Sequence, residues 1–165
     1  MAGVLGGWPV PYTRRMDESG EVGLSAAERW VEVEAIKQLK ARYFRLMDTK
    51  EWLPFSRVFS DDVEVDVSHD KHAPGDFIRG RADVVDFIRR AVGKATTVHH
   101  GHMPEIELLS PTEARGVWAM FDYVEFKPGR GIRGYGHYHE EYRKENGSWH
   151  IRKLKLTRLR VDPLG

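Results

Sequence analysis

The second half of the chain contains four long segments in which apolar and polar residues alternate, separated by short turn sequences. A period of two is typical of strands that keep one face against a core. The turn sequences SPTEA, KPGRG and ENGS carry the residues expected between antiparallel neighbours. These features predict an antiparallel sheet made of consecutive hairpins. The predicted strands are approximately 96–108, 114–126, 133–144 and 148–160.

The first half of the chain has the pattern of helices. Ser25 and Glu28 match a capping box, and an apolar stripe follows at helical spacing. We expect a short helix around EWLPFSRVF, a strand at VEVDV, a loop at SHDKHAPGD and a third helix at RADVVDFIRRAVG. The first helix should bury Ile36, Leu39, Tyr43 and Leu46 or Met47, with Lys37, Lys40, Arg42 and Arg45 mostly elsewhere, and the third should bury Val84, Phe87, Ile88 and Ala91.

The order of helices first and strands later favours an α+β fold, with helices on one face of a curved antiparallel sheet. The chain has 165 residues, enough for one domain with a sizeable core, and its 41% hydrophobic content is ordinary for a globular protein. Residues 1–24 are rich in glycine and proline and have no periodicity. We therefore expect a flexible arm over 1–24 and a single domain over 25–165.

Charge and cysteine content exclude several classes of function. The chain has no cysteine, which excludes disulfides, thiolate nucleophiles and zinc–thiolate sites. Its net charge of +1 gives no bulk attraction to nucleic acid or to an anionic membrane, although IRKLKLTRLR is locally basic. No segment has the length of a membrane span, and the first residues lack the pattern of a secretory signal. We expect a cytoplasmic protein with no nucleic-acid or membrane partner.

The segment TVHHGH places His99, His100 and His102 on the first long strand. His100 and His102 are two residues apart and share a face of the strand, as do His137 and His139. Such pairs could supply imidazole ligands for zinc, iron or copper. Neighbours on a regular strand face opposite sides, however, so the three histidines cannot converge without a bulge. We expect no metal, and His100, His102 and His139 on a polar outer or intersubunit face, although alternation leaves open whether His99 or His100 faces inward.

One carboxylate interrupts an apolar strand face. In ARGVWAMFDYVEF, Asp122 is the only charged residue on its side of the strand. A buried carboxylate must be paired, hydrogen-bonded or protonated, and a group in that situation is suited to acid–base chemistry. A structural ion pair with an arginine such as Arg158 is the alternative. The face consists of Ala114, Gly116, Trp118, Met120, Asp122, Val124 and Phe126.

The order of these segments resembles the SnoaL-like group of the NTF2-like superfamily, and within it the scytalone dehydratase and bile-acid dehydratase branch. The resemblance is carried by AIKQLKARYFRLMDTKEWLPFSRVFSDDVEVDV, GRADVVDFIRRAVG and TVHHGHMPEIEL, and it covers about residues 25 to 160. It implies a cone, in which a bent sheet wraps around three N-terminal helices and a deep apolar pocket opens between them. The fold hosts several chemistries and also non-catalytic domains, so it indicates the architecture better than the reaction.

The same resemblance implies which residues face the pocket. The tyrosine and aspartate that the branch takes from its first helix match Tyr43 and Asp48, and its histidine on the strand after the third helix matches His99. Polar residues on later strands fall at Asp122 and near Tyr138. Scytalone dehydratase has a serine and an asparagine where this chain has a glycine and Tyr138, so we do not expect the same substrate.

These residues together predict a cofactor-independent lyase, in first place a dehydratase, acting on a hydrophobic cyclic or aromatic hydroxy compound. The His99–Asp48 pair would move the proton, while Tyr43 and Asp122 would hydrogen-bond the substrate oxygen or assist the leaving group. An isomerase or an aldol-type lyase with the same pair, or a non-catalytic ligand-binding module, is the alternative. The resemblance also implies a homo-oligomer, with a trimer favoured over a dimer. The expected substrate-pocket residues are Trp118, Met120, Tyr138 and Arg158.

Overall fold

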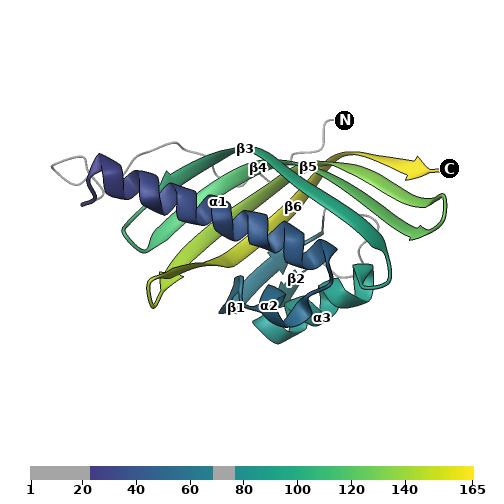
Figure 1. The fold of residues 1–165 in the computed structure, drawn as a ribbon, viewed down its shortest axis with the longest axis horizontal. Helices are drawn as coiled ribbons and strands as arrows, with labels where there is room; N and C mark the ends of the chain where they lie inside the picture. The colour runs from purple at the N-terminus through teal and green to yellow at the C-terminus, as the bar shows by residue number, and fades with distance from the viewer. Residues whose placement is uncertain (1–22, 69–76) are drawn as a thin grey trace, which may run out of the picture.

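The computed structural model describes residues 23–68 and 77–165, which form one six-stranded sheet and three helices (Figure 1). The helices are α1 (Ala26–Asp48), α2 (Trp52–Ser56) and α3 (Arg81–Val92). The strands are β1 (Phe59–Asp66), β2 (Phe77–Arg79), β3 (Thr96–Leu108), β4 (Glu113–Lys127), β5 (Arg130–Glu145) and β6 (Ser148–Leu164). Their order in the sheet is β2-β1-β6-β5-β4-β3. The expected arm, residues 1–24, lies outside the described residues except for its last two positions.

The four long strands pair as successive antiparallel hairpins, as the alternation predicts. The turn between β5 and β6 has positive φ at Asn146 and Gly147, which is the conformation that a two-residue type I′ hairpin requires. The sheet as a whole is mixed, because β1 lies parallel to β6 beside the expected antiparallel strands. Strand β2 was not expected. It spans only three residues, too few to display a period.

Helix α1 crosses in front of the long strands and buries its apolar stripe against them (Figure 1). The capping box at its start is present, with the Glu28 N–H donating to Ser25 Oγ and the Ser25 N–H donating to Glu28 Oε2. Near its end the helix packs directly on β3, where a side chain at Gly101 would come within 2.7 Å of the Phe44 ring. The stripe positions Ile36, Leu39, Tyr43, Leu46 and Met47 are all buried.

Two residues on an inward-facing side are nevertheless exposed, and each lies near the end of its element. Ala91 in the last turn of α3 is exposed, whereas Val84 is buried and Val85, Phe87 and Ile88 pack against the core. Phe126 keeps 53% of its surface exposed, because β4 runs past the core at that point. Helical and strand periodicity identify the inward side of an element but not where along it the core stops.

Lys40 is fully buried, although the stripe placed it on another side of the helix. Its Nζ lies 2.5 Å from Glu140 Oε1 on β5 and 3.7 Å from the centre of the Tyr138 ring. The other oxygen of Glu140 accepts a hydrogen bond from the Tyr142 hydroxyl, which in turn accepts one from Trp118 Nε1 at 2.8 Å. A buried cation is tolerated when a carboxylate and aromatic faces compensate its lost hydration. This network ties the middle of α1 to the centre of the sheet.

Removing one member of the buried pair should destabilise the fold more than neutralising both. Lys40→Met leaves the Glu140 charge uncompensated and should lower the free energy of unfolding by about 3–5 kcal/mol. The double variant Lys40→Met/Glu140→Gln should lose clearly less than the sum of the two single losses. Urea denaturation of the four proteins measures this cycle, with Lys37→Met on the exposed side of α1 as the control. Strictly additive losses would contradict the pairing.

Candidate active site

Asp48, the last residue of α1, contacts His99 of β3 through both of its carboxylate oxygens. Oδ1 lies 2.6 Å from His99 Nδ1, and Oδ2 accepts the His99 backbone N–H at 2.9 Å. The side chains keep 20% and 6% of their surface exposed, respectively. The His99 ring lies parallel to Phe44, with 6.4 Å between the ring centres. The structure therefore answers the question that alternation left open, because His99 faces α1 whereas His100 is exposed.

The surroundings of Asp48 keep it ionised. Burial acts to raise the pKa of Asp48, but the hydrogen bonds and charge of His99 and the Thr97 hydroxyl outweigh burial and lower that pKa. A carboxylate can only accept hydrogen bonds, so Nδ1 of His99 must carry the proton that it shares with Asp48. Nε2 is then the ring atom left to accept or release a proton.

Asp122 lies directly opposite His99 in the β3–β4 register and is 2% exposed. Its Oδ2 accepts a hydrogen bond from Arg158 Nη1 at 2.7 Å, so the ion pair that the sequence offered as an alternative is present. Its Oδ1 is buried and has no hydrogen-bond partner among the described residues. Gly134 on β5 makes this possible, because a Cβ there would come within 2.2 Å of Asp122 Oδ1. One acceptor atom is thus available to a group that donates.

Tyr43 of α1 and Tyr138 of β5 lie against each other on the same side of the sheet, with ring centres 6.1 Å apart. Burial raises the pKa of Tyr43, and the negative charges of Glu140, Asp48 and Asp122 raise it further. Burial also raises the pKa of Tyr138 well above its usual value. Both phenols therefore keep their protons at neutral pH and can act only as hydrogen-bond donors or neutral acceptors.

Trp118 and Met120 of β4 are buried on the face that carries Asp122, as expected. Trp118 pairs across the strands with Tyr138, and the Met120 sulfur lies 3.7 Å from Arg158 Nη1. All eight residues predicted for the site are thus on the inner side of the sheet or on α1 facing it. They belong to, or border, a packed interior that is aromatic and contains a few polar atoms.

The remaining strand histidines lie on the other face of the sheet. The His100 and His102 rings are 5.9 Å apart, and those of His137 and His139 are 6.1 Å apart. His139 Nε2 is 3.2 Å from the Thr157 hydroxyl. Within residues 23–68 and 77–165, no three side chains of histidine, cysteine, aspartate or glutamate are grouped as metal ligands would be.

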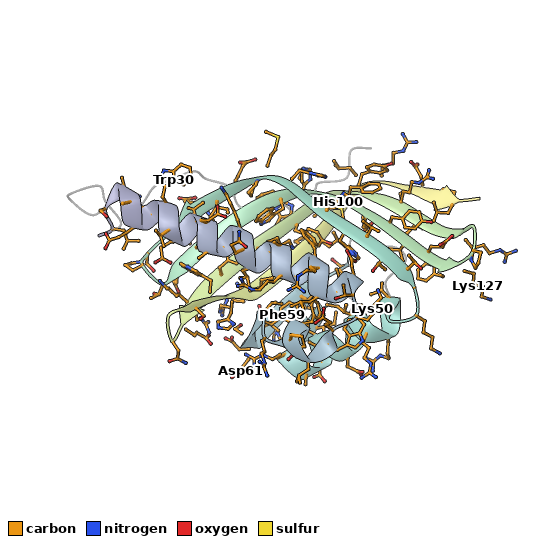
Figure 2. The ribbon with its side chains drawn as sticks, in the orientation of Figure 1. Trp30, Lys50, Phe59, Asp61, His100 and Lys127 are labelled. Carbon is orange, nitrogen blue, oxygen red and sulfur yellow. The ribbon has the colours of Figure 1, made fainter. Side chains whose placement is uncertain are left out.

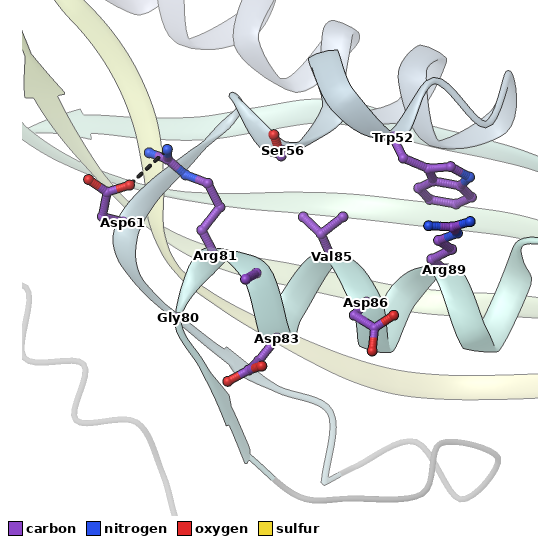
Figure 3. Close-up of a pocket in the computed structure, with 10 residues that line it drawn as sticks. Trp52, Ser56, Asp61, Gly80, Arg81, Asp83, Val85, Asp86 and Arg89 are labelled. Atoms are coloured by element: carbon purple, nitrogen blue, oxygen red, sulfur yellow. Dashed lines mark ion pairs between the residues drawn. The ribbon is translucent and has the colours of Figure 1, made fainter.

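A hollow of about 660 Å³ opens at the surface between α2 and α3, and it is separate from the residues above (Figure 3). Arg81 is held there by Asp61 at 2.7 Å and by the carbonyl of Phe59, and the Trp52 ring faces Arg89. None of the eight predicted site residues lines this hollow. It is lined by Trp52, Ser56, Asp61, Gly80, Arg81, Ala82, Asp83, Val85, Asp86 and Arg89.

Residues 28–155 match the family model of the SnoaL-like domain, which is more than half of the chain. The chain belongs to this family. A Gibberella zeae protein named probable cyclase FGR4 is 24% identical over 75% of this chain and 89% of its own length. A proposed scytalone dehydratase from Novosphingobium aromaticivorans has 22% identity and a TM-score of 0.74, covering 84% of this chain and 91% of that one.

A further solved structure of the same fold is the hexachlorocyclohexane dehydrochlorinase LinA-type3 from Novosphingobium barchaimii. It is 19% identical, has a TM-score of 0.74 and covers 86% of this chain and 95% of that one. At such identities the structural likeness establishes the NTF2-like fold of this SnoaL-like domain. In the described part of the chain, no helix has the length and apolar character needed to cross a membrane.

Two polar residues of this SnoaL-like domain touch the Asp48–His99 pair or its neighbours and were not predicted. The Thr97 hydroxyl donates to Asp48 Oδ1 at 2.8 Å, and Lys50 Nζ donates to Thr97 Oγ1 at 2.7 Å. Strand parity could have found Thr97, which is two residues from His99 and so shares its face. Nothing in the local sequence signals Lys50, because its position depends on how α1 ends.

Asp48→Asn should make the stability of the protein less sensitive to acid. The pKa of Asp48 in the folded chain is below its usual 3.8, so the ionised carboxylate stabilises the fold above that pH. This stabilisation is lost as the pH falls through the lowered value. The difference in unfolding free energy between wild type and Asp48→Asn should be constant near about pH 5. It should shrink as the pH falls below 3.8, the usual pKa of an aspartate.

Urea denaturation at a series of pH values measures this difference. Asp61→Asn is the control, because that carboxylate is 90% exposed. A difference between wild type and Asp48→Asn that grows towards low pH would contradict the assignment of Asp48 as a stabilised carboxylate.

Proposed function

We propose that this SnoaL-like protein is a cofactor-independent lyase, a dehydratase acting on a hydrophobic cyclic or aromatic hydroxy compound. The observation that carries the proposal is the 2.6 Å contact between Asp48 Oδ1 and His99 Nδ1 inside an aromatic interior. A histidine backed by a carboxylate is a positioned general base. Two proteins of the same fold have names that describe eliminations, a dehydratase and a dehydrochlorinase.

The proposed reaction begins with proton transfer to His99 Nε2. The proton comes from the carbon next to the one that bears the hydroxyl, and the electron pair of the C–H bond forms the new double bond. Asp48 stabilises the imidazolium that results. The C–O bond breaks, and the departing hydroxyl takes the proton back from the imidazolium and leaves as water. The products are the dehydrated ring compound and one water, with His99 restored.

Two further groups are suited to hold the substrate oxygen. Asp122 Oδ1 is a buried acceptor without a partner among the described residues, and it can receive the hydrogen of a substrate hydroxyl. Tyr43 stays protonated because its pKa is raised, and so it can donate to a carbonyl or to the leaving oxygen. Trp118, Met120 and Tyr138 supply an apolar wall against which a ring is held by burial.

Replacing His99 by alanine should lower the rate by about 10²-fold or more if its ring is the base. The assay screens hydroxylated ring compounds and detects loss of water by mass spectrometry. His100→Ala is the matched control, because it removes the neighbouring imidazole from the opposite face of the same strand and should leave the rate nearly unchanged. An active substrate that is turned over equally well by His99→Ala would contradict the role of His99.

The mass of the product separates the dehydratase from its chemical rivals. An isomerase or a cyclase, as one relative is named, would begin with the same proton abstraction but leave the mass unchanged. A carbon–carbon lyase would release a carbon fragment instead of water. Either result would keep the His99–Asp48 pair as the base and replace the reaction assigned to it.

A further inference from the structure

Two side chains share one oxygen of Asp48, and a third side chain bonds one of them. Lys50 Nζ donates to Thr97 Oγ1 at 2.7 Å, and the Thr97 hydroxyl donates its own hydrogen to Asp48 Oδ1 at 2.8 Å. The same oxygen lies 2.6 Å from His99 Nδ1. Oδ1 is therefore shared between the imidazole and a hydroxyl that is itself polarised by an ammonium group.

Lys50 has a backbone conformation that glycine usually adopts. Its φ of 62° lies in the left-handed region, and it directly follows Thr49, the C-cap of α1. Figure 2 labels Lys50 near the end of α1. The Glu51 N–H bonds the Leu46 carbonyl at 2.9 Å, and the Lys50 N–H bonds that of Met47 at 3.2 Å. This is the Schellman pattern, in which glycine is the common residue at the position of Lys50. A strained residue beside a candidate active site suggests that its side chain is needed there.

The Lys50 ammonium is also partly withdrawn from water. Burial lowers the pKa of Lys50, while the charge of Asp48 acts in the opposite direction. Ionisable groups of four elements lie on the same side of the sheet as the His99–Asp48 pair. They are Tyr43 of α1, Asp122 of β4, Tyr138 of β5 and Arg158 of β6.

We propose that Lys50 and Thr97 are positioning residues that act through Asp48, an inference that rests on the lyase function proposed above. Thr97 fixes the orientation of the carboxylate, and Lys50 draws negative charge away from the oxygen that faces His99. A carboxylate alone favours the protonated imidazole. The opposing pull of Lys50 and Thr97 on Asp48 Oδ1 weakens the attraction that this carboxylate exerts on the imidazolium form of the ring.

Titration of the His99 ring signals by NMR tests this without a substrate. Lys50→Gly removes the ammonium and suits the left-handed backbone, so the melting temperature should stay or rise. The midpoint of the His99 titration should nevertheless move to higher pH, by about half a unit or more. Thr97→Val should move the midpoint in the same direction, because it removes the hydroxyl that binds Asp48.

Conservative variants serve as matched controls. Lys50→Arg keeps the charge and Thr97→Ser keeps the hydroxyl, so both should titrate close to wild type. Unchanged midpoints in Lys50→Gly and Thr97→Val would overturn the inference. If Lys50→Gly also had a lower melting temperature, the role of Lys50 would be structural. Shifted midpoints in a protein that dehydrates no ring compound would support the positioning role and refute the proposed function.

Discussion

The carboxylate of Asp48 is where the first helix and the candidate base depend on each other. It accepts the His99 backbone N–H as well as hydrogen bonds from the His99 ring and the Thr97 hydroxyl. A carboxylate withdrawn from water requires such partners, so the end of α1 can lie only where β3 supplies them. The contact between Asp48 and His99, which orients the imidazole for proton transfer, therefore also holds the end of α1 against β3.

A second polar contact holds α1 against the sheet at Lys40, nearer to the N-terminus of the helix. Lys40 and Glu140 form a fully buried ion pair, and the Lys40 ammonium lies 4.1 Å from the Tyr43 ring centre. Asp48 follows Lys40 by eight positions along the helix, a rise of about 12 Å. Tyr43 lies between these two attachments. The helix is therefore held on both sides of the phenol that the proposed reaction uses, which restricts the freedom of that ring relative to His99.

Local patterns predicted the three helices, the strand at VEVDV and the four long strands, but not β2. Alternation placed four strands and put Asp122 on the inner face, and the resemblance matched Asp48 and His99, which do make contact. Pairing between distant segments has no local signal, which is why the parallel β1–β6 contact was missed. The burial of Lys40 was not predicted either, because its partner Glu140 is 100 residues away in the sequence.

The proposed base requires the proton of the neutral His99 ring to be on Nδ1. The ¹⁵N chemical shifts of the two ring nitrogens at neutral pH report directly which nitrogen carries it. The contact with Asp48 predicts a protonated Nδ1 and a bare Nε2. A spectrum in which Nε2 carries the proton and Nδ1 is bare would contradict the assignment of His99 as the base held by Asp48.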